Sequence, residues 1–397
     1  AKDKELFHEF CRFVIGNPLR QQPAASGKPA AEQGYRTTGI QDLALIYQGG
    51  SHRLDWTVDE FRPYVVHRFA DGSKDWLFDG FLFLEFKDGS GRNYTVGYEK
   101  LNARRTEWEW LLDRIFEQGK SLSALDRCIG QEIKELGKPA FRHQIVLGLP
   151  EAIRGQKDWG EIDGREMDFS KEEDQIAATK WYIGELVERF KAAKYKHLEL
   201  SGFYWVAEDT HHCAELTIPL SEYIHSEGKL FYWIPYWQAK GHEEWKRLGF
   251  DVAYQQPNHF FNHSIPDSRL DEACATARRH GMAMEFEFDE KATAAIPNSS
   301  HDRMAAYINH FEKNDVFNSS AVAYYCGNRG VLTLDESDNP KDKALMDRLA
   351  RIIQARRYLK YGIPMKNKTR VVAHRGFWHT DGSAQNSIAS LLKADQL

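Results

Sequence analysis

The sequence predicts an α/β protein whose main part is a (β/α)8 barrel of the TIM type. Eight short runs rich in β-branched and aromatic residues recur along the chain, and segments of helical period separate most of them. Alternating strands and helices form parallel sheets with crossover helices, and eight such units close a barrel. An open doubly wound sheet is the alternative, but no Gly-rich phosphate loop follows any strand.

The expected strands share a composition typical of buried parallel strands. They are residues 43–47, 76–86, 143–149, 197–205, 230–237, 252–256, 282–288 and 320–326. Helix starts are predicted by two capping-box patterns, Thr57 with Glu60 and Ser170 with Glu173. Asn339-Pro340 predicts the start of the last helix, because proline suits the first helical position.

The 397 residues are expected to divide into three parts. Residues 1–36 read as an N-terminal extension, and residues 37–363 as the barrel with a glycoside-hydrolase-like organisation. Residues 364–397 hold a proline and basic linker followed by a strand and a turn. This last part is expected to be the truncated first βα unit of a second domain.

Composition limits the classes of function. A hydrophobic content of 42% and a formal net charge of -5 describe an ordinary globular protein, so no nucleic-acid partner is expected. The longest apolar run is shorter than the roughly 20 residues of a membrane helix, so no membrane-spanning segment is expected. Five widely spaced cysteines and no recognisable ligand spacing predict neither a disulfide framework nor a metal site. No cofactor is expected, and no feature points to an oligomeric state.

The seventh expected strand carries the first candidate catalytic residues. Active sites of these barrels lie at the C-terminal ends of the strands. Alternation along 282–288 directs the Met and Phe side chains outward and both Glu285 and Glu287 into the barrel. Two carboxyl groups in a confined space raise at least one pKa, as acid/base catalysis requires. The alternative is that an interior Arg or Lys neutralises them.

Glu208, just beyond the fourth strand, is the second candidate. Glycosidic cleavage uses one protonated carboxyl group and a second carboxylate that acts as nucleophile or base. Carboxylates after strand four and on strand seven also resemble, in position, those of the large retaining group of barrel glycosidases. The alternative is that Glu208 and Asp209 belong to a solvated loop.

Aromatic and amide residues cluster at several strand ends. Sugars offer flat C–H faces and many hydroxyl groups, so their sites combine aromatic platforms with polar donors. The alternative for any of these aromatic residues is packing of the core or of a loop. The candidate substrate-binding residues are Tyr47, Gln48, Trp205, Tyr236, Trp237, Gln256, Asn258 and His259.

Four motifs together resemble a bacterial domain-of-unknown-function family, number 4855. They are 42–47 (DLALIY), 75–84 (DWLFDGFLFL), 202–205 (GFYW) with Glu208, and 256–258 (QPN). The resemblance covers roughly residues 40–330 and implies an exported barrel protein of glycan-degrading bacteria. It therefore implies a periplasmic or extracellular location, although no signal-peptide pattern begins the chain.

The C-terminal segment resembles the start of the glycerophosphodiester phosphodiesterases. His374-Arg375-Gly376 matches their opening turn, and Gln385-Asn386-Ser387 matches a later Glu-Asn-Thr. In that family the histidine serves acid/base chemistry and carboxylates bind a divalent metal. Here Gln385 replaces the acidic ligand and the sequence ends at Leu397, so this segment is expected to be catalytically inactive.

The sequence thus favours a glycoside hydrolase acting on an oligosaccharide or polysaccharide. Glu208 would be the acid/base, and Glu287 or else Glu285 the nucleophile. A noncatalytic carbohydrate-binding barrel is the second hypothesis, and it predicts that interior bases neutralise Glu285 and Glu287. A bifunctional protein with a phosphodiesterase domain is the third.

Overall fold

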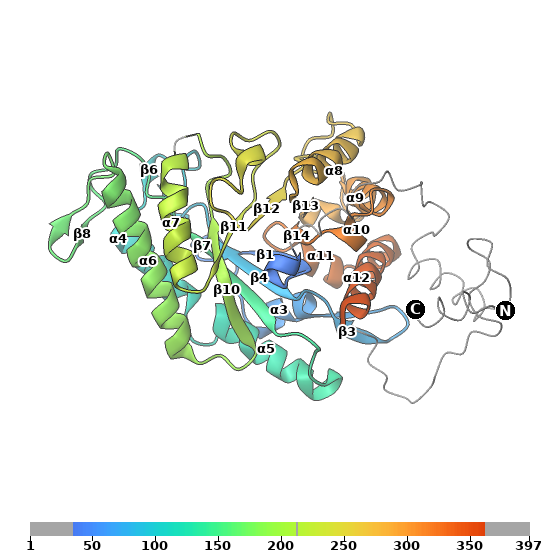
Figure 1. Ribbon diagram of the computed structural model, residues 1–397. Coiled ribbons are helices and arrows are strands. Elements are labelled where there is room, and N and C mark those ends of the chain that lie inside the picture. Colours follow the sequence, from blue (N-terminus) through green and yellow to red (C-terminus); the bar gives the residue numbers. More distant parts are fainter. Residues whose placement is uncertain (1–34, 212, 362–397) are drawn as a thin grey trace, which may run out of the picture. The chain divides into compact units, whose positions relative to one another are not determined.

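The computed structural model describes residues 35–211 and 213–361 (Figure 1). Eight parallel strands close a barrel, as the sequence predicts, in the ring order β1, β14, β13, β12, β11, β10, β7, β4. Their bounds are β1 Asp42–Tyr47, β4 Gly80–Leu84, β7 His143–Leu149, β10 Leu198–Trp205, β11 Leu230–Trp233, β12 Val252–Gln255, β13 Ala283–Glu287 and β14 Val322–Tyr325.

Helices surround these strands in Figure 1. The longer ones are α3 Val58–Val65, α4 Arg105–Ile115, α5 Ser121–Leu136, α6 Glu172–Ala193, α7 Ala214–Ser226, α8 Ser268–His280, α9 His301–Lys313, α11 Gly330–Glu336 and α12 Pro340–Tyr361. Short elements are α2 Tyr35–Thr38, α10 Val316–Ser319, η2 His242–Glu244 and η3 Glu290–Ala292. Three small strand pairs lie outside the barrel: β2 Val66–Arg68 with β3 Lys74–Trp76, β5 Arg92–Asn93 with β6 Leu101–Asn102, and β8 Glu161–Ile162 with β9 Arg165–Glu166.

Two of the three predicted helix starts are confirmed. Thr57 caps α3, and its backbone N–H donates to the Glu60 carboxylate at 3.1 Å. The last helix begins at Pro340. The start at Ser170 is wrong, because α6 begins at Glu172 and the Ser170 hydroxyl instead donates to Asp168 at 2.6 Å.

The expected strand 76–86 is divided in two. Its first residue ends β3, and the barrel strand β4 starts only at Gly80. Between them the Asp79 carboxylate accepts backbone N–H groups of Gln41 at 3.0 Å and Asp42 at 2.8 Å. A Cβ at residue 80 would lie 2.6 Å from Ile40 Cγ2, so glycine permits close packing here. The expected strand 230–237 ends early at Trp233, two residues before a proline that lacks the N–H a strand needs.

The barrel interior is filled by alternate residues of the strands. Ala283 belongs to the interior cluster of buried side chains, together with Tyr47 and Tyr204. Phe286 has the opposite parity and contacts the Tyr307 ring of α9 at 5.0 Å, outside the barrel. Glu285 and Glu287 share the parity of Ala283, so they point inward at the C-terminal end.

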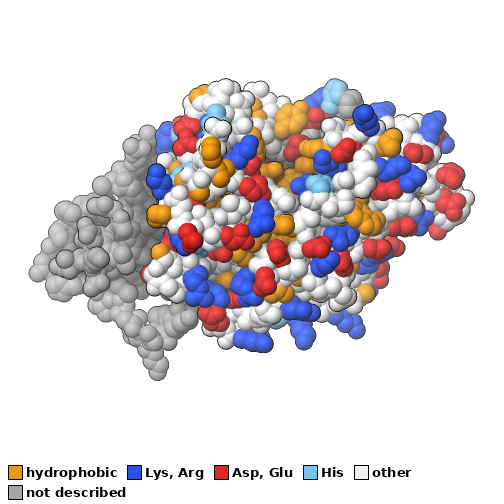
Figure 2. Space-filling view, turned by 180° about the vertical axis from the view of Figure 1, so that it is seen from behind, with side chains coloured by type: hydrophobic (Ala, Val, Ile, Leu, Met, Phe, Trp, Pro, Cys, Tyr) orange, Lys and Arg blue, Asp and Glu red, His pale blue; other side chains and the backbone are white. Residues whose placement is uncertain are grey.

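Acidic and basic side chains lie next to one another across the molecular face shown in Figure 2. None of the helices within the described residues combines the length and apolar character needed to cross a bilayer. The expected N-terminal extension, except residues 35 and 36, lies outside the described residues. So does the expected C-terminal βα fragment with His374, Arg375, Gly376 and Gln385.

Candidate active site

A cavity of about 520 Å³ lies at the C-terminal ends of the barrel strands, and Glu208, Glu285 and Glu287 all line it. Glu208 follows β10, the fourth barrel strand, whereas Glu285 and Glu287 lie on β13, the seventh. Strands β11 and β12 separate β10 from β13 in the ring. Closure of the barrel therefore brings carboxyl groups from distant parts of the chain to one cavity, as the sequence analysis expected.

Two amide side chains connect Glu208 with Glu287. Gln256 donates through Nε2 to Glu208 Oε1 at 2.8 Å. Asn258 Nδ2 lies 2.9 Å from Gln256 Oε1 and 3.4 Å from Glu287 Oε1. Both amides follow β12, the strand next to β13, so they are placed to orient the two carboxyl groups relative to each other.

Glu287 is the most strongly held of the three carboxyl groups. Its Oε2 accepts hydrogen bonds from the Tyr307 hydroxyl of α9 and from the His259 backbone N–H at 3.1 Å. Burial raises the pKa of Glu287 to about 7, although these two hydrogen bonds act in the opposite direction. Converging donors favour the charged form, so Glu287 is poised to ionise near neutral pH.

Glu208 and Glu285 lie in surroundings that favour the protonated form. Burial raises the pKa of Glu208, and its hydrogen bond from Gln256 opposes that effect. Burial also raises the pKa of Glu285 well above its usual range, and the charges of Glu287 and Glu208 add to the effect. Within the described residues, none of the three carboxylates forms an ion pair with a base. Because the charge of Glu287 raises the pKa of Glu285, these two groups do not ionise independently.

Three of the expected substrate-binding residues line this cavity, namely Tyr47, Gln256 and Asn258. The Tyr47 ring packs edge-on against Phe86 at 5.6 Å and Tyr325 at 5.5 Å. Asn258 has a φ of 48°, a left-handed conformation that asparagine tolerates better than most residues. This conformation accompanies a bond from the Trp237 backbone N–H to Asn258 Oδ1 at 2.6 Å.

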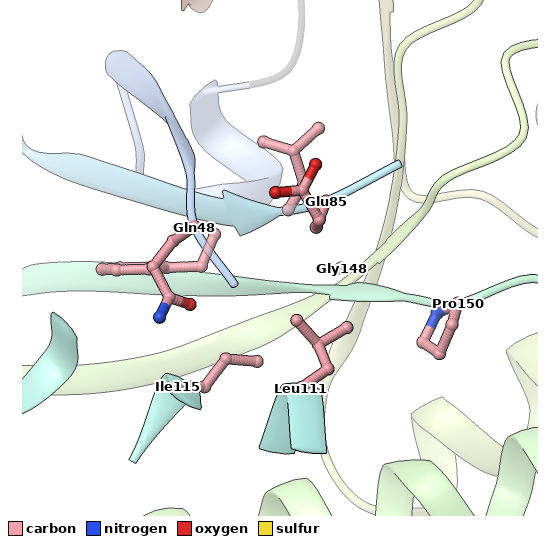
Figure 3. A pocket seen from close by; sticks show the side chains of 8 residues that line it. Gln48, Glu85, Leu111, Ile115, Gly148 and Pro150 are labelled. Carbon is pink, nitrogen blue, oxygen red and sulfur yellow. The ribbon is translucent and has the colours of Figure 1, made fainter. Parts of the chain in front are cut away.

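The structure corrects the expectation for Gln48. Its side chain lines a separate small pocket between the barrel and α4, where Leu111 and Ile115 lie beside it (Figure 3). There its Nε2 donates to the Arg114 carbonyl at 2.9 Å. Strand alternation is the reason, because Tyr47 points into the barrel and the next residue must point away.

Trp205 requires the same correction. It is buried outside the barrel, where its ring meets Phe231 edge-on at 6.1 Å. Its neighbour Tyr204 is the residue that lines the cavity. Inward Tyr204 and outward Trp205 again follow from alternation.

Tyr236, Trp237 and His259 also do not line the cavity. The Tyr236 hydroxyl donates to Asp209 at 3.2 Å, and the Arg269 guanidinium lies 4.7 Å from the centre of the Trp237 ring. The His259 imidazole is fully buried, 2.8 Å from Asp267, and burial lowers its pKa to about 4. Only the backbone N–H of His259 serves the site.

Several cavity residues were missed by the sequence analysis. Arg53, His52 and Lys87 line the cavity from the loops after β1 and β4. Tyr98 and Phe261 add aromatic rings that are 43% and 51% exposed. The Gly-Gly pair before His52 and Arg53, directly after a barrel strand, was the available signal for a constrained loop at the active end.

Comparison with known proteins adds a family match. The family described as "Domain of unknown function (DUF4855)" matches residues 42–351. No curated protein matches the chain. In the described residues, no three His, Cys, Asp or Glu side chains are grouped as a metal ion requires.

Among solved structures, a candidate alpha-L-fucosidase from Bacteroides thetaiotaomicron is 13% identical with a TM-score of 0.41, covering 85% of this chain and 99% of its own. The tryptophan synthase A-subunit from Pyrococcus furiosus is 9% identical with a TM-score of 0.37, covering 80% and 98%. Tryptophan synthase from M. tuberculosis is 8% identical with a TM-score of 0.37, covering 82% and 100%.

Proposed function

We propose that this chain, which belongs to the DUF4855 family, is a glycoside hydrolase. It uses two of its own carboxyl groups to cleave an oligosaccharide or polysaccharide. One observation carries the proposal. Glu208 follows strand four and Glu287 ends strand seven; both line one cavity and are joined through Gln256 and Asn258. Glycosidic cleavage needs a carboxyl pair across the scissile bond, one protonated and one charged.

The two environments support different roles. Several donors converge on Glu287, so its carboxylate is the nucleophile that attacks the anomeric carbon. Glu208 is buried with one donor, so it holds the proton that passes to the leaving oxygen as the glycosidic bond breaks. Glu208 then takes a proton from water, whose oxygen attacks the anomeric carbon and releases Glu287. The structure of the site favours Glu287 over Glu285, because no described donor bonds to Glu285.

The cavity walls suit a sugar. Tyr98 stacks on Phe86 with 4.7 Å between ring centres, and Phe261 meets Tyr325 edge-on at 5.3 Å. Exposed rings at the mouth offer flat surfaces for C–H faces, and the two amides offer donors and acceptors to hydroxyl groups. The alternative of a noncatalytic carbohydrate-binding barrel requires interior bases beside Glu285 and Glu287. The described residues instead surround Glu287 with a tyrosine, an amide and a backbone N–H.

A screen of the purified chain against chromogenic glycosides and polysaccharides tests the proposal. We expect hydrolysis of at least one substrate class, and loss of that activity in Glu208→Gln and Glu287→Gln. An absence of hydrolysis across α- and β-linked hexosides, pentosides and uronides would reject the proposal. Export to the periplasm or the medium, where glycan polymers occur, is part of the proposal and can be tested by fractionating the producing cells.

Glu208→Gln is expected to lower kcat/KM by about 10²- to 10⁴-fold for substrates with poor leaving groups, because the leaving oxygen loses its proton donor. The dinitrophenolate released from a dinitrophenyl glycoside is a stable anion that needs no proton, so cleavage of this substrate should be much less affected. The values of kcat/KM for substrates with the two leaving groups measure this difference, because kcat/KM does not include the later step in which Glu208 acts as the base. Equal losses for the two substrates would contradict the acid role.

Tyr307→Phe is expected to move the acid limb of the kcat/KM profile to higher pH. The nucleophile must be ionised, and its pKa is about 7 with the Tyr307 hydroxyl lowering it. Removing that donor raises the pKa, so activity appears only at more alkaline pH. Tyr182→Phe is the matched control, because the buried Tyr182 hydroxyl has no hydrogen-bond partner in the described structure. An unchanged profile in Tyr307→Phe would refute the effect on Glu287.

A further inference from the structure

The cavity has an acidic side and a basic side. Glu208 follows β10, and Glu285 and Glu287 lie on β13. Arg53 and Lys87 line the cavity from the loops after β1 and β4. In the ring order of strands, the pair β1 and β4 lies opposite the arc from β13 to β10. A bound molecule therefore meets carboxyl groups at one end and cationic groups at the other.

Arg53 is held rigidly with part of its guanidinium facing the cavity. Its Nε and Nη2 donate to the two oxygens of Glu85 at 2.9 and 2.8 Å, and the guanidinium carbon lies 4.5 Å from the centre of the Tyr47 ring. The Glu85 side chain is fully buried, whereas that of Arg53 keeps 16% of its surface exposed. No described residue accepts a hydrogen bond from Nη1, so this edge is available to a ligand.

The loop that carries Arg53 is built around Glu85. The Gly50 backbone N–H donates to Glu85 Oε2 at 2.9 Å, and a Cβ at Gly50 would lie 2.7 Å from that oxygen. Gly49 has a φ of 126°, and a Cβ there would lie 2.3 Å from Leu111 Cδ1. Gly49 thus has a conformation that favours glycine, and Gly50 lets the backbone approach Glu85 closely. Such preorganisation costs little entropy when an anion binds.

We propose that the sugar bound here carries an anionic substituent, a carboxylate or a sulfate ester, which pairs with Arg53. This inference rests on the proposed function and names its substrate class. The planar guanidinium matches both anions with parallel hydrogen bonds. Lys87, which also pairs with Glu99 at 3.3 Å, places a second cationic group at the rim. The charged carboxylate of Glu287 repels an anion, so the substituent points to Arg53 and the glycosidic bond lies between Glu208 and Glu287.

Binding measurements separate this inference from catalysis. Isothermal titration calorimetry with the Glu287→Gln chain would give the dissociation constants of uronic-acid, sulfated and neutral oligosaccharides of matched linkage. We expect at least one acidic class to bind about tenfold or more tightly than its neutral counterpart. The advantage should shrink as salt rises. Neutral sugars that bind as tightly as both acidic classes would overturn the inference.

Variants in the same background test the residue. Adding Arg53→Gln should lower the preference for the acidic over the neutral oligosaccharide about tenfold or more. Arg247→Gln on the exposed surface should leave this preference unchanged. Should Arg53→Gln not fold, Lys87→Gln at the rim and the salt dependence of the parent chain replace it. An unreduced preference for the acidic over the neutral sugar in a folded Arg53→Gln variant would overturn the assignment. If that variant does not fold, an unreduced preference in Lys87→Gln together with no salt dependence in the parent chain would overturn it. Binding without hydrolysis by the unsubstituted chain rejects only the proposed function.

Discussion

Glu287→Gln is expected to lower kcat by at least about 10³-fold on any glycoside that the chain hydrolyses, while sugar binding persists. The neutral amide keeps the shape of the side chain but cannot form the covalent bond to the anomeric carbon. Steady-state kinetics together with titration of an oligosaccharide would separate the two effects. We expect kcat to fall while the affinity for the sugar is retained.

The control for Glu287→Gln is Glu243→Gln, a substitution in η2 where the side chain is 63% exposed. Its kcat should stay within about twofold of the parent, since surface changes away from the site have small effects.

The stability of Glu287→Gln tests the raised pKa of Glu287. The pKa of Glu287 is raised to about 7, so its ionisation opposes folding as pH rises from the unfolded value of roughly 4.3. Glu287→Gln should therefore not lower the melting temperature at pH 8. A kcat above about one tenth of that of the parent chain in Glu287→Gln would contradict the nucleophile role.

Glu85→Ala is expected to lower the free energy of unfolding by about 3 kcal/mol, the largest stability effect we predict. Glu85 accepts hydrogen bonds from Arg53 and from the backbone N–H groups of Gly50 and Phe86. Its removal leaves a mostly buried guanidinium and these N–H groups without their acceptor. Urea unfolding followed by circular dichroism measures the loss.

Glu99→Ala is the matched control for Glu85→Ala. Glu99 also pairs with a cavity-lining cation, Lys87, at 3.3 Å, but both side chains are about one third exposed. An exposed pair of this kind contributes about 0.2–1 kcal/mol. Equal losses in the two variants would show that burial of Glu85 is not what makes its pair with Arg53 stabilising.

Alternation along single strands predicted part of the site well. It directed Glu285 and Glu287 into the barrel, and both line the cavity. The same rule, applied to the ends of the first and fourth strands, separates Tyr47 from Gln48 and Tyr204 from Trp205. Tyr47 and Gln48 cannot both face a bound sugar, because neighbours on a strand face opposite sides. These corrections therefore follow from a rule that the sequence already contained.

The sequence by itself determined the eight strands, the barrel and the inward direction of its strand-seven carboxylates, because these depend on periodicities of two and 3.6 residues along one segment. Only the tertiary structure decided which side chains meet. The bond from Gln256 to Glu208 joins residues 48 apart, and that from Arg53 to Glu85 joins residues 32 apart. A hydrogen bond forms only over about 3 Å. Local pattern predicts which way a side chain points, whereas closure of the barrel sets the distance between segments.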